Sequence, residues 1–193
     1  MYKRQIAGCD VILCRTGYTG EHGYEIVPRW EDAATVWDAL VLAMKPFDGL
    51  ICGLGARDTL RTEMGYPLHG HELSLDITPV QASAGWAIGW KKESFRGSEV
   101  LRTQREEVAV RSLRALKSND RAIPRAGMTV TDSDGNAIGI VTSGTFSPSL
   151  KVGIALALVE PRYVEGDDLI IDVRGRQSSA TVTALPLVPS RVR

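Results

Sequence analysis

The spacing of apolar residues predicts a helix over residues 31–44. Five apolar side chains recur there at helical intervals and form a single stripe: Val36, Trp37, Leu40, Val41 and Met44. Glu31 and Asp32 would occupy the first turn, where the helix dipole favours negative charge. Pro46 cannot continue an α-helix, so we expect the helix to end just before it.

Two further helices and a series of short strands follow from the same kind of pattern. The helices are expected over residues 56–64, where Gly65 provides the stop, and over 97–105, where one face is charged. Residues 66–79 have no clear periodicity, which indicates a long loop. The expected strands cover residues 10–14, 24–26, 50–54, 86–90, 128–131, 138–142, 152–159, 169–173 and 179–184.

The pattern of residue types changes after residue 108, where short β-branched runs alternate with turn signals. Residues 132–136, Asp-Ser-Asp-Gly-Asn, are one such signal and predict a hairpin. This spacing is typical of a small antiparallel barrel or sandwich. Charged residues mark the boundary before it: Arg102, Arg105, Glu106 and Glu107. We therefore expect an α+β fold with one domain over 6–105 and a second over 106–193.

The first five residues, Met1–Gln5, do not fit the pattern that follows them. Their Tyr-Lys-Arg-Gln run resembles one reading frame of a common sequencing adapter. We hypothesise that this segment is not native and leave it out of the predicted domain. An ordinary frayed N-terminus is the alternative. The DNA upstream of codon 6 decides between the two, because native coding sequence there would refute the hypothesis.

Composition limits the classes of function. The chain has 193 residues, of which 44% are hydrophobic, and its 23 basic and 23 acidic residues give a formal net charge of zero. This balance argues against a protein that mainly coats nucleic acid or an anionic membrane. No apolar run approaches membrane-spanning length and no secretory signal opens the chain, so we expect a bacterial-type cytoplasmic protein. Three sparse cysteines are expected to be free thiols: Cys9, Cys14 and Cys52.

Two stretches, 15–26 and 52–65, combine turn glycines with polar side chains that a core does not need. Three glycines within seven residues suit a tight turn or a close ligand: Gly17, Gly20 and Gly23. Glu25 can accept a pair of hydrogen bonds from an amidine-like edge, although a solvent-facing strand glutamate has the same pattern. Arg57 and Arg61 share a helix face, and ordinary surface charge is the alternative for both.

Four segments resemble signatures of the aminomethyltransferase family, the T-protein of the glycine cleavage system. The first two are Arg-Thr-Gly-Tyr-Thr-Gly-Glu-His-Gly-Tyr-Glu-Ile at 15–26 and Cys-Gly-Leu-Gly-Ala-Arg-Asp at the start of 52–65. The others are Thr-Pro-Val-Gln-Ala-Ser-Ala-Gly-Trp at 78–86 and Ile-Val-Thr-Ser-Gly-Thr-Phe-Ser-Pro-Ser-Leu at 140–150. The resemblance begins at about Ala7 and covers the C-terminal half of the family. It implies part of the folate-binding domain followed by a small antiparallel β-barrel.

The resemblance also implies an activity. The family transfers the aminomethyl group on the lipoyl arm of H-protein to tetrahydrofolate, releasing ammonia, 5,10-methylenetetrahydrofolate and the reduced lipoyl protein. The partners it implies are H-protein and folate. The key catalytic aspartate of the family lies in the N-terminal half, so no catalytic residue is assigned within this chain. We expect the chain by itself to be inactive, or nearly so.

The resemblance carries over four folate-site residues, and Trp86 is a fifth candidate. Glu25 corresponds to the glutamate that binds the pterin of tetrahydrofolate, and Tyr18 to the tyrosine that lines the same pocket. Arg57 corresponds to a folate-site arginine, and Arg61 falls within the same motif. A guanidinium suits ring carbonyl oxygens or the glutamate tail of folate. Trp86 is either a wall of the cleft near folate or an ordinary core tryptophan.

Related families and other sites give alternative interpretations. Sarcosine and dimethylglycine dehydrogenases and the dimethylsulfoniopropionate demethylase carry a similar folate module. A folate-binding protein of iron–sulfur cluster maintenance has a Lys-Gly-Cys-x-x-Gly-Gln signature, whereas residues 64–70 here contain no cysteine. A non-functional gene remnant is the third alternative. His69 and His71 lack further ligand residues nearby, and residues 132–136 lack the downstream glutamate of a calcium loop, so no metal site is expected.

Overall fold

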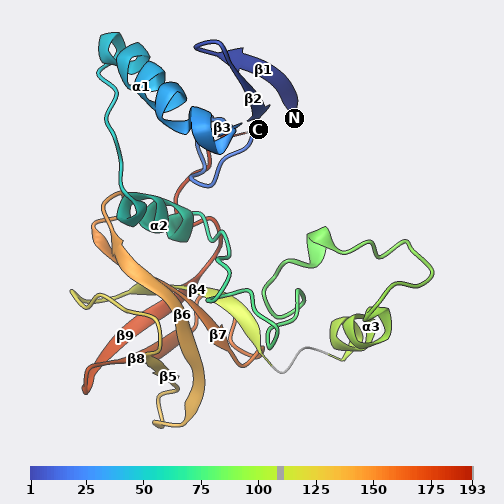
Figure 1. The fold of residues 1–193 in the computed structure, drawn as a ribbon. Helices are drawn as coiled ribbons and strands as arrows, with labels where there is room; N and C mark the ends of the chain where they lie inside the picture. Colours follow the sequence, from blue (N-terminus) through green and yellow to red (C-terminus); the bar gives the residue numbers. More distant parts are fainter. Residues whose placement is uncertain (108–110, 193) are drawn as a thin grey trace. The chain divides into compact units, whose positions relative to one another are not determined.

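The computed structural model describes residues 1–107 and 111–192, which form two compact units (Figure 1). The first unit comprises residues 1–60 and 190–192, and the second comprises the described residues of 61–189. The predicted change of residue pattern at residue 108 falls outside the described residues. Among the described residues, no helix has both the length and the apolar character needed to cross a bilayer.

A three-stranded antiparallel sheet opens the first unit. Its strands are β1 (Tyr2–Ile6), β2 (Cys9–Cys14) and β3 (Glu25–Pro28), paired in the order β1-β2-β3. Ala7 and Gly8 join the first two strands with φ angles of 50° and 78°, as a two-residue hairpin turn requires. β1 pairs with β2 along its whole length, and the non-native origin of residues 1–5 stays a prediction. The predicted strands at residues 10–14 and 24–26 are confirmed, and they pair antiparallel.

Helices complete the first unit. A 3₁₀ turn, η1 (Trp30–Asp32), leads into α1 (Ala33–Met44), and a second 3₁₀ turn, η2 (Lys45–Phe47), follows. The helix predicted over 31–44 is therefore confirmed, with a tighter first turn. Pro46 ends the α-helical part, since it cannot donate the next backbone hydrogen bond.

The predicted strand at residues 50–54 is wrong. Residues 50–53 are irregular, and Leu54 is the first residue of α2 (Leu54–Glu63). A short apolar run next to glycine does not distinguish a strand from the start of a helix. The helix predicted over 56–64 is confirmed, and its last three residues belong to the second unit. Gly65 follows with a φ of 71°, the left-handed conformation typical of a helix stop.

A closed six-stranded barrel forms the core of the second unit (Figure 1). All its strand pairs are antiparallel, in the order β4-β7-β6-β5-β8-β9. The predicted barrel is confirmed and the sandwich alternative is wrong. The strands are β4 (Ser112–Ser118), β5 (Thr129–Thr131), β6 (Ala137–Ser147), β7 (Val152–Val159), β8 (Asp168–Val173) and β9 (Arg176–Thr183).

Apolar side chains from all six strands fill the barrel. β7 is the most deeply placed strand, since every residue from Gly153 to Val159 is buried. Leu116 of β4 and Ile171 of β8 are fully buried in the same cluster. Burial of a Leu or Ile side chain contributes about 1.5–3 kcal/mol. The barrel therefore has a core of its own that can stabilise it.

A long irregular segment and one short helix connect α2 to the barrel. The loop predicted at 66–79 is confirmed, with isolated bridges such as His69–Leu73. The strand predicted at 86–90 is wrong, because residues Gly85–Ala87 form a 3₁₀ turn, η3. Trp90 explains the difference, since its Nε1 donates to the carbonyl of Gly85 at 2.7 Å and closes a turn. The helix predicted over 97–105 is confirmed as α3 (Ser98–Glu106).

Candidate functional site

The glycine-rich loop between β2 and β3 lies at the centre of the candidate site. It covers residues 15–24 and turns the chain so that the two strands pair. Gly20 is buried with a φ of 75°, a conformation that a side chain would disfavour. Two of its polar side chains, the hydroxyl of Thr16 and the phenol of Tyr18, lie two residues apart. Both side chains make contacts with the other predicted site residues.

Glu25 is the first residue of β3 and its side chain is exposed. The Thr16 hydroxyl donates a hydrogen bond to Oε2 of the Glu25 carboxylate. An ionised carboxylate has about four acceptor positions on its two oxygens. One bond from Thr16 therefore orients Glu25 and leaves capacity for two parallel N–H donors.

Arg57 of α2 stacks on the aromatic ring of Tyr18. The guanidinium carbon lies 4.3 Å from the ring centroid. Tyr18 is half-buried and Arg57 is exposed, and a cation–π contact at an exposed site contributes about 0.5–1 kcal/mol. Stacking uses one face of the planar guanidinium, so the N–H groups at its edge stay oriented for an acceptor. Glu25 and Arg57 thus both contact the same three-residue segment, 16–18.

The chain's last described residues also reach this loop. The backbone N–H of Arg191 donates to the carbonyl of Gly20 at 2.9 Å. Its Nε lies 3.6 Å from Oε1 of Glu21, and both side chains are largely exposed. An exposed pair of this kind contributes at most about 1 kcal/mol. The tail contact comes from residues far apart in the sequence, and no local motif signals it.

The structure places Arg61 differently from Arg57. Its guanidinium is fully buried in the second unit and forms an ion pair with Glu72 at 3.0 Å. It also donates to the hydroxyl of Ser143 at 2.7 Å. The predicted helix face shared by Arg57 and Arg61 does not give them a shared environment. Arg61 has no exposed surface for a folate contact, because its partners enclose it.

Trp86 lies in the second unit, in η3, with 86% of its surface exposed. It is not a core tryptophan, so that alternative is wrong. The structure brings Tyr18, Glu25 and Arg57 to one loop of the first unit, and it places Arg61 and Trp86 in the other unit. Glu72 is the buried partner that sequence reasoning missed, since no motif surrounds it.

Three other groups that could carry chemistry, Cys9, His71 and Asp132, have surroundings that do not favour such a role. Burial, and secondarily Asp32, raise the pKa of the Cys9 thiol, which keeps it protonated and weakly nucleophilic at neutral pH. His71 donates from Nδ1 to the Thr142 carbonyl at 2.7 Å. Asp132 accepts hydrogen bonds from Asn136 within the β5–β6 turn. Within residues 1–107 and 111–192, no group of three His, Cys, Asp or Glu side chains is arranged to hold a metal.

Comparison with protein families matches both parts of the chain. A family model described as the GCVT N-terminal domain matches residues 1–92. A second, described as the glycine cleavage T-protein C-terminal barrel domain, matches residues 111–189. The second match includes all six strands of the barrel.

Curated relatives and a solved structure agree with these matches. An aminomethyltransferase of Parafrankia sp. (strain EAN1pec) is 55% identical over 186 residues, 96% of this chain and 51% of the relative. One of Mycobacterium tuberculosis is 50% identical over 189 residues, 97% of this chain and 51% of the relative. The crystal structure of glycine cleavage system aminomethyltransferase T from Bartonella henselae is 34% identical, with a TM-score of 0.85, over 93% of this chain and 50% of that one. The chain spans about half the length of these relatives.

Proposed function

Since this chain belongs to the glycine cleavage T-protein family, we propose that it supplies the folate-contacting half of an aminomethyltransferase. The proposed reaction transfers the aminomethyl group from the lipoyl arm of H-protein to tetrahydrofolate. Nitrogen leaves as ammonia, and the carbon becomes the methylene bridge of 5,10-methylenetetrahydrofolate. The lipoyl sulfur retains the bonding electron pair, so the lipoyl protein leaves reduced. The relatives named aminomethyltransferase, at 50–55% identity, support this assignment.

One observation carries the proposal for the site. Glu25 is oriented by Thr16, and Arg57 by the ring of Tyr18, so an acidic and a basic group both rest on one short loop segment. We propose that the Glu25 carboxylate accepts two hydrogen bonds from a ring N–H and the exocyclic amine of the pterin. Charge-assisted pairs of this kind are about twice as strong as neutral ones and are selective in geometry.

Arg57 takes the complementary role in the proposal. Its guanidinium edge would donate to a carbonyl oxygen of the ring or to a carboxylate of the glutamate tail. Trp86, whose ring is exposed, belongs to the second unit and is left out of the site proposed on Glu25 and Arg57. Arg61 is left out of this site because its guanidinium is enclosed by Glu72 and Ser143.

The residues of this chain contribute positioning and electrostatics. Tetrahydrofolate itself supplies the nucleophilic nitrogen. Holding that nitrogen in place converts a bimolecular encounter into an effectively unimolecular step. We assign no acid or base within the chain. The demethylase and iron–sulfur maintenance alternatives gain no support from a particular residue of the site, so we do not propose them.

Folate binding by the full chain tests the site. The stable analogue 5-formyltetrahydrofolate is titrated calorimetrically into the wild type and into Glu25→Gln. Loss of the charge should weaken binding by at least about 10-fold, because a hydrogen bond to a charged group contributes about 1.5–3 kcal/mol. Glu31→Gln is the matched control, since Glu31 is an exposed glutamate of the same unit. Unchanged affinity in Glu25→Gln would refute the assigned role.

A second pair of variants tests the basic group. Arg57→Met should weaken binding of the same analogue, whereas Arg29→Met, another exposed arginine of the first unit, should leave it within two-fold of wild type. Equal effects of the two substitutions would show a general charge effect in place of a specific contact. Circular dichroism of each variant confirms that the fold is retained.

A further inference from the structure

A cavity of about 600 Å³ lies in the second unit, between the barrel and the loop that follows α2. Its walls come from the loop at 70–81, the turn at 126–127, strands β6 and β7, and Arg111 just before β4. The volume falls within the range of about 300–1,000 Å³ that is usual for small-molecule sites. None of the residues proposed for folate lines this cavity, so a ligand here would have a recognition chemistry of its own.

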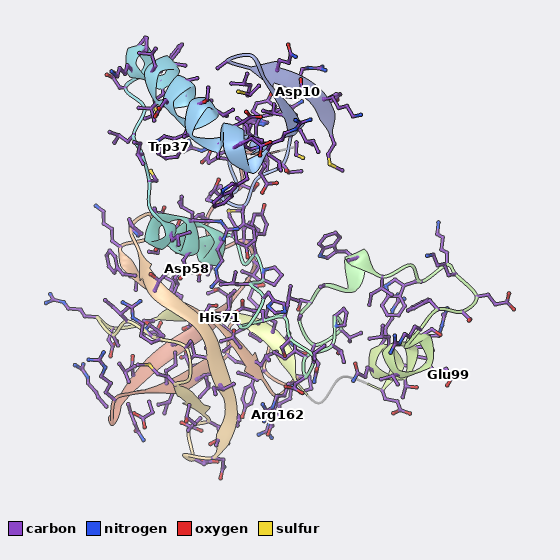
Figure 2. The ribbon with its side chains drawn as sticks, viewed as in Figure 1. Asp10, Trp37, Asp58, His71, Glu99 and Arg162 are labelled. Carbon is purple, nitrogen blue, oxygen red and sulfur yellow. The ribbon has the colours of Figure 1, made fainter. Side chains whose placement is uncertain are left out.

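A β-bulge in β6 holds two of these walls in place. The pairing of β6 with β7 shifts register between Val141 and Ser143, so Thr142 is the extra residue. The carbonyl of Thr142 accepts a hydrogen bond from Nδ1 of His71 at 2.7 Å, which ties the loop to the barrel (Figure 2). The carbonyl of Val141 accepts from the backbone N–H of Gly127 at 2.8 Å, which ties the turn to the same strand. The walls are therefore fixed by hydrogen bonds within one unit.

Part of the cavity lining is apolar. Ile140 of β6 and Leu158 of β7 are register partners, so they lie next to each other on one face of the sheet. Leu158 is buried, and Ile77 of the loop packs against the cluster that contains it. An apolar group placed against these side chains would leave water, which is favourable. The lining therefore suits a ligand with an apolar part, and an inorganic ion would gain nothing from it.

Two exposed side chains of opposite charge, Asp76 and Arg111, line the same cavity. Within residues 1–107 and 111–192, neither charged group takes part in an ion pair or a side-chain hydrogen bond. Glu160 lines a neighbouring cavity together with Arg111, but its carboxylate is already paired with Arg162 at 2.9 Å. One negative and one positive group are thus both available to a single ligand.

Gln81 adds a neutral donor to the cavity lining. Its Oε1 accepts a hydrogen bond from the backbone N–H of Thr78 at 2.9 Å. That bond orients the amide and leaves its NH₂ group as a donor. The polar lining thus includes two donors, Arg111 and Gln81, and one anionic acceptor, Asp76. This set matches a ligand that carries one carboxylate and one ammonium group.

We propose that this cavity binds a free α-amino acid with a large apolar side chain. The carboxylate of the amino acid accepts from Arg111, its ammonium group donates to Asp76, and its side chain rests on Ile140 and Leu158. Hydrogen bonds between charged groups are the strong ones, so the two charges give the site its selectivity. The proposal uses no residue of the folate site, and it can therefore hold or fail independently of the proposed function.

The test titrates L-phenylalanine into the full chain labelled with ¹⁵N and follows the backbone amides by two-dimensional NMR. We expect saturable shifts at amides that line the cavity, such as that of Gly127, with a Kd of about 1 mM or below. 3-Phenylpropanoate lacks the ammonium group and 2-phenylethylamine lacks the carboxylate. Each should bind at least about five-fold more weakly, because one charge-assisted contact is lost. Equal affinities for the three compounds, or no saturable shift at about 20 mM phenylalanine, would overturn the proposal.

Matched substitutions assign the two charged contacts. Asp76→Asn and Arg111→Gln should each weaken binding of L-phenylalanine at least about five-fold. Glu165→Gln and Arg121→Gln remove exposed charges of the same unit that do not line the cavity, and should stay within about two-fold of wild type. Because all four side chains are exposed, none of the changes should unfold the chain. Asp76→Asn should leave the affinity for 3-phenylpropanoate unchanged, since that compound has no ammonium group. An equal loss for both compounds in Asp76→Asn would refute the assigned contact.

Discussion

Arg61 and Glu72 form a buried ion pair, with Nη1 of the arginine 3.0 Å from Oε2 of the glutamate. Ser143 of β6 closes the arrangement, since its hydroxyl accepts from Arg61 at 2.7 Å and donates to Glu72 at 2.6 Å. The backbone N–H of Leu68 donates to the same carboxylate at 2.9 Å. The end of α2 and the loop after it are thereby attached to a barrel strand through polar contacts between buried side chains.

Removal of one partner from this pair should be strongly destabilising. Arg61→Met leaves Glu72 buried without its counter-charge, and we expect the free energy of unfolding to fall by about 3–5 kcal/mol. Urea denaturation followed by circular dichroism measures the change. Arg162→Met is the control, since Arg162 forms an exposed pair with Glu160 and its loss should cost less than about 1 kcal/mol.

The double variant Arg61→Met/Glu72→Met tests whether the two charged side chains stabilise one another. If the two charges stabilise one another, the double substitution costs less than the sum of the single ones. Strict additivity, within about 0.5 kcal/mol, would show that each residue acts alone. That result would contradict the coupling between the end of α2 and the loop.

Gly153 of β7 is a second position where the barrel tolerates no change. A Cβ atom there would lie 2.1 Å from the carbonyl oxygen of Ala122 and 2.9 Å from Cδ of Pro124. Both contacts involve groups that cannot rotate away, so the strand would have to shift. We expect Gly153→Ala to lower the free energy of unfolding by about 1–3 kcal/mol, measured by thermal denaturation.

Gly55, in contrast to Gly153, is a glycine at which a side chain should be tolerated. It lies within α2, and a Cβ atom there meets nothing within 4 Å. Gly55→Ala should raise stability by about 0.4–1 kcal/mol, because alanine restricts the unfolded chain and favours the helix. A loss of stability in Gly55→Ala, or none in Gly153→Ala, would contradict the packing described for the two helix and strand positions.

Local chemistry explains which elements the sequence predicted. The hairpin at residues 132–136 follows from turn residues between apolar runs, and the structure shows Asp132 capping that turn. The predicted strand at residues 86–90 is wrong because a local contact, from the Trp90 side chain back to the Gly85 carbonyl, closes a turn there. β4 was not predicted, since Leu113, Ala115 and Leu116 are good helix formers. Its place between β7 and β9 overrides their propensity.

Part of the candidate site could likewise be predicted from the sequence, and part could not. The glycine loop and the helix that carries Arg57 follow from sequence, because each depends on neighbouring residues. The stacking of Arg57 on Tyr18 joins positions 39 residues apart in the chain, and the pairing of Arg61 with Glu72 depends on the fold around them. Helical spacing alone placed Arg57 and Arg61 on one face, whereas burial gives them different environments.

The acid stability of the barrel should depend on Asp120. A hydrogen bond from the backbone N–H of Ala122, with help from Ser178 and Arg176, lowers the pKa of this carboxyl below its ordinary value. A lowered pKa in the folded state stabilises the fold above the unfolded value of about 3.9. That contribution is lost as the pH falls through the lower, folded value.

Asp120→Asn should therefore flatten the loss of stability below about pH 4. Thermal midpoints at a series of pH values measure the slope. Glu165→Gln removes an exposed carboxylate from the same unit and should keep the wild-type dependence on pH. An unchanged acid slope in Asp120→Asn would show that other carboxylates carry the effect.

The bond from Thr16 to Glu25 gives a prediction that bears directly on folate binding. If the hydroxyl orients the carboxylate, Thr16→Val keeps the shape of the side chain and removes the donor. We expect 5-formyltetrahydrofolate to bind about 3–10-fold more weakly, since one hydrogen bond contributes about 1 kcal/mol net. Thr16→Ser retains the donor and should stay within two-fold of wild type. Calorimetry on both variants distinguishes the effect of the hydroxyl on folate affinity from that of the methyl group. A weaker Thr16→Ser, with Thr16→Val unchanged, would mean that packing of the methyl group and not the hydrogen bond holds Glu25 in place.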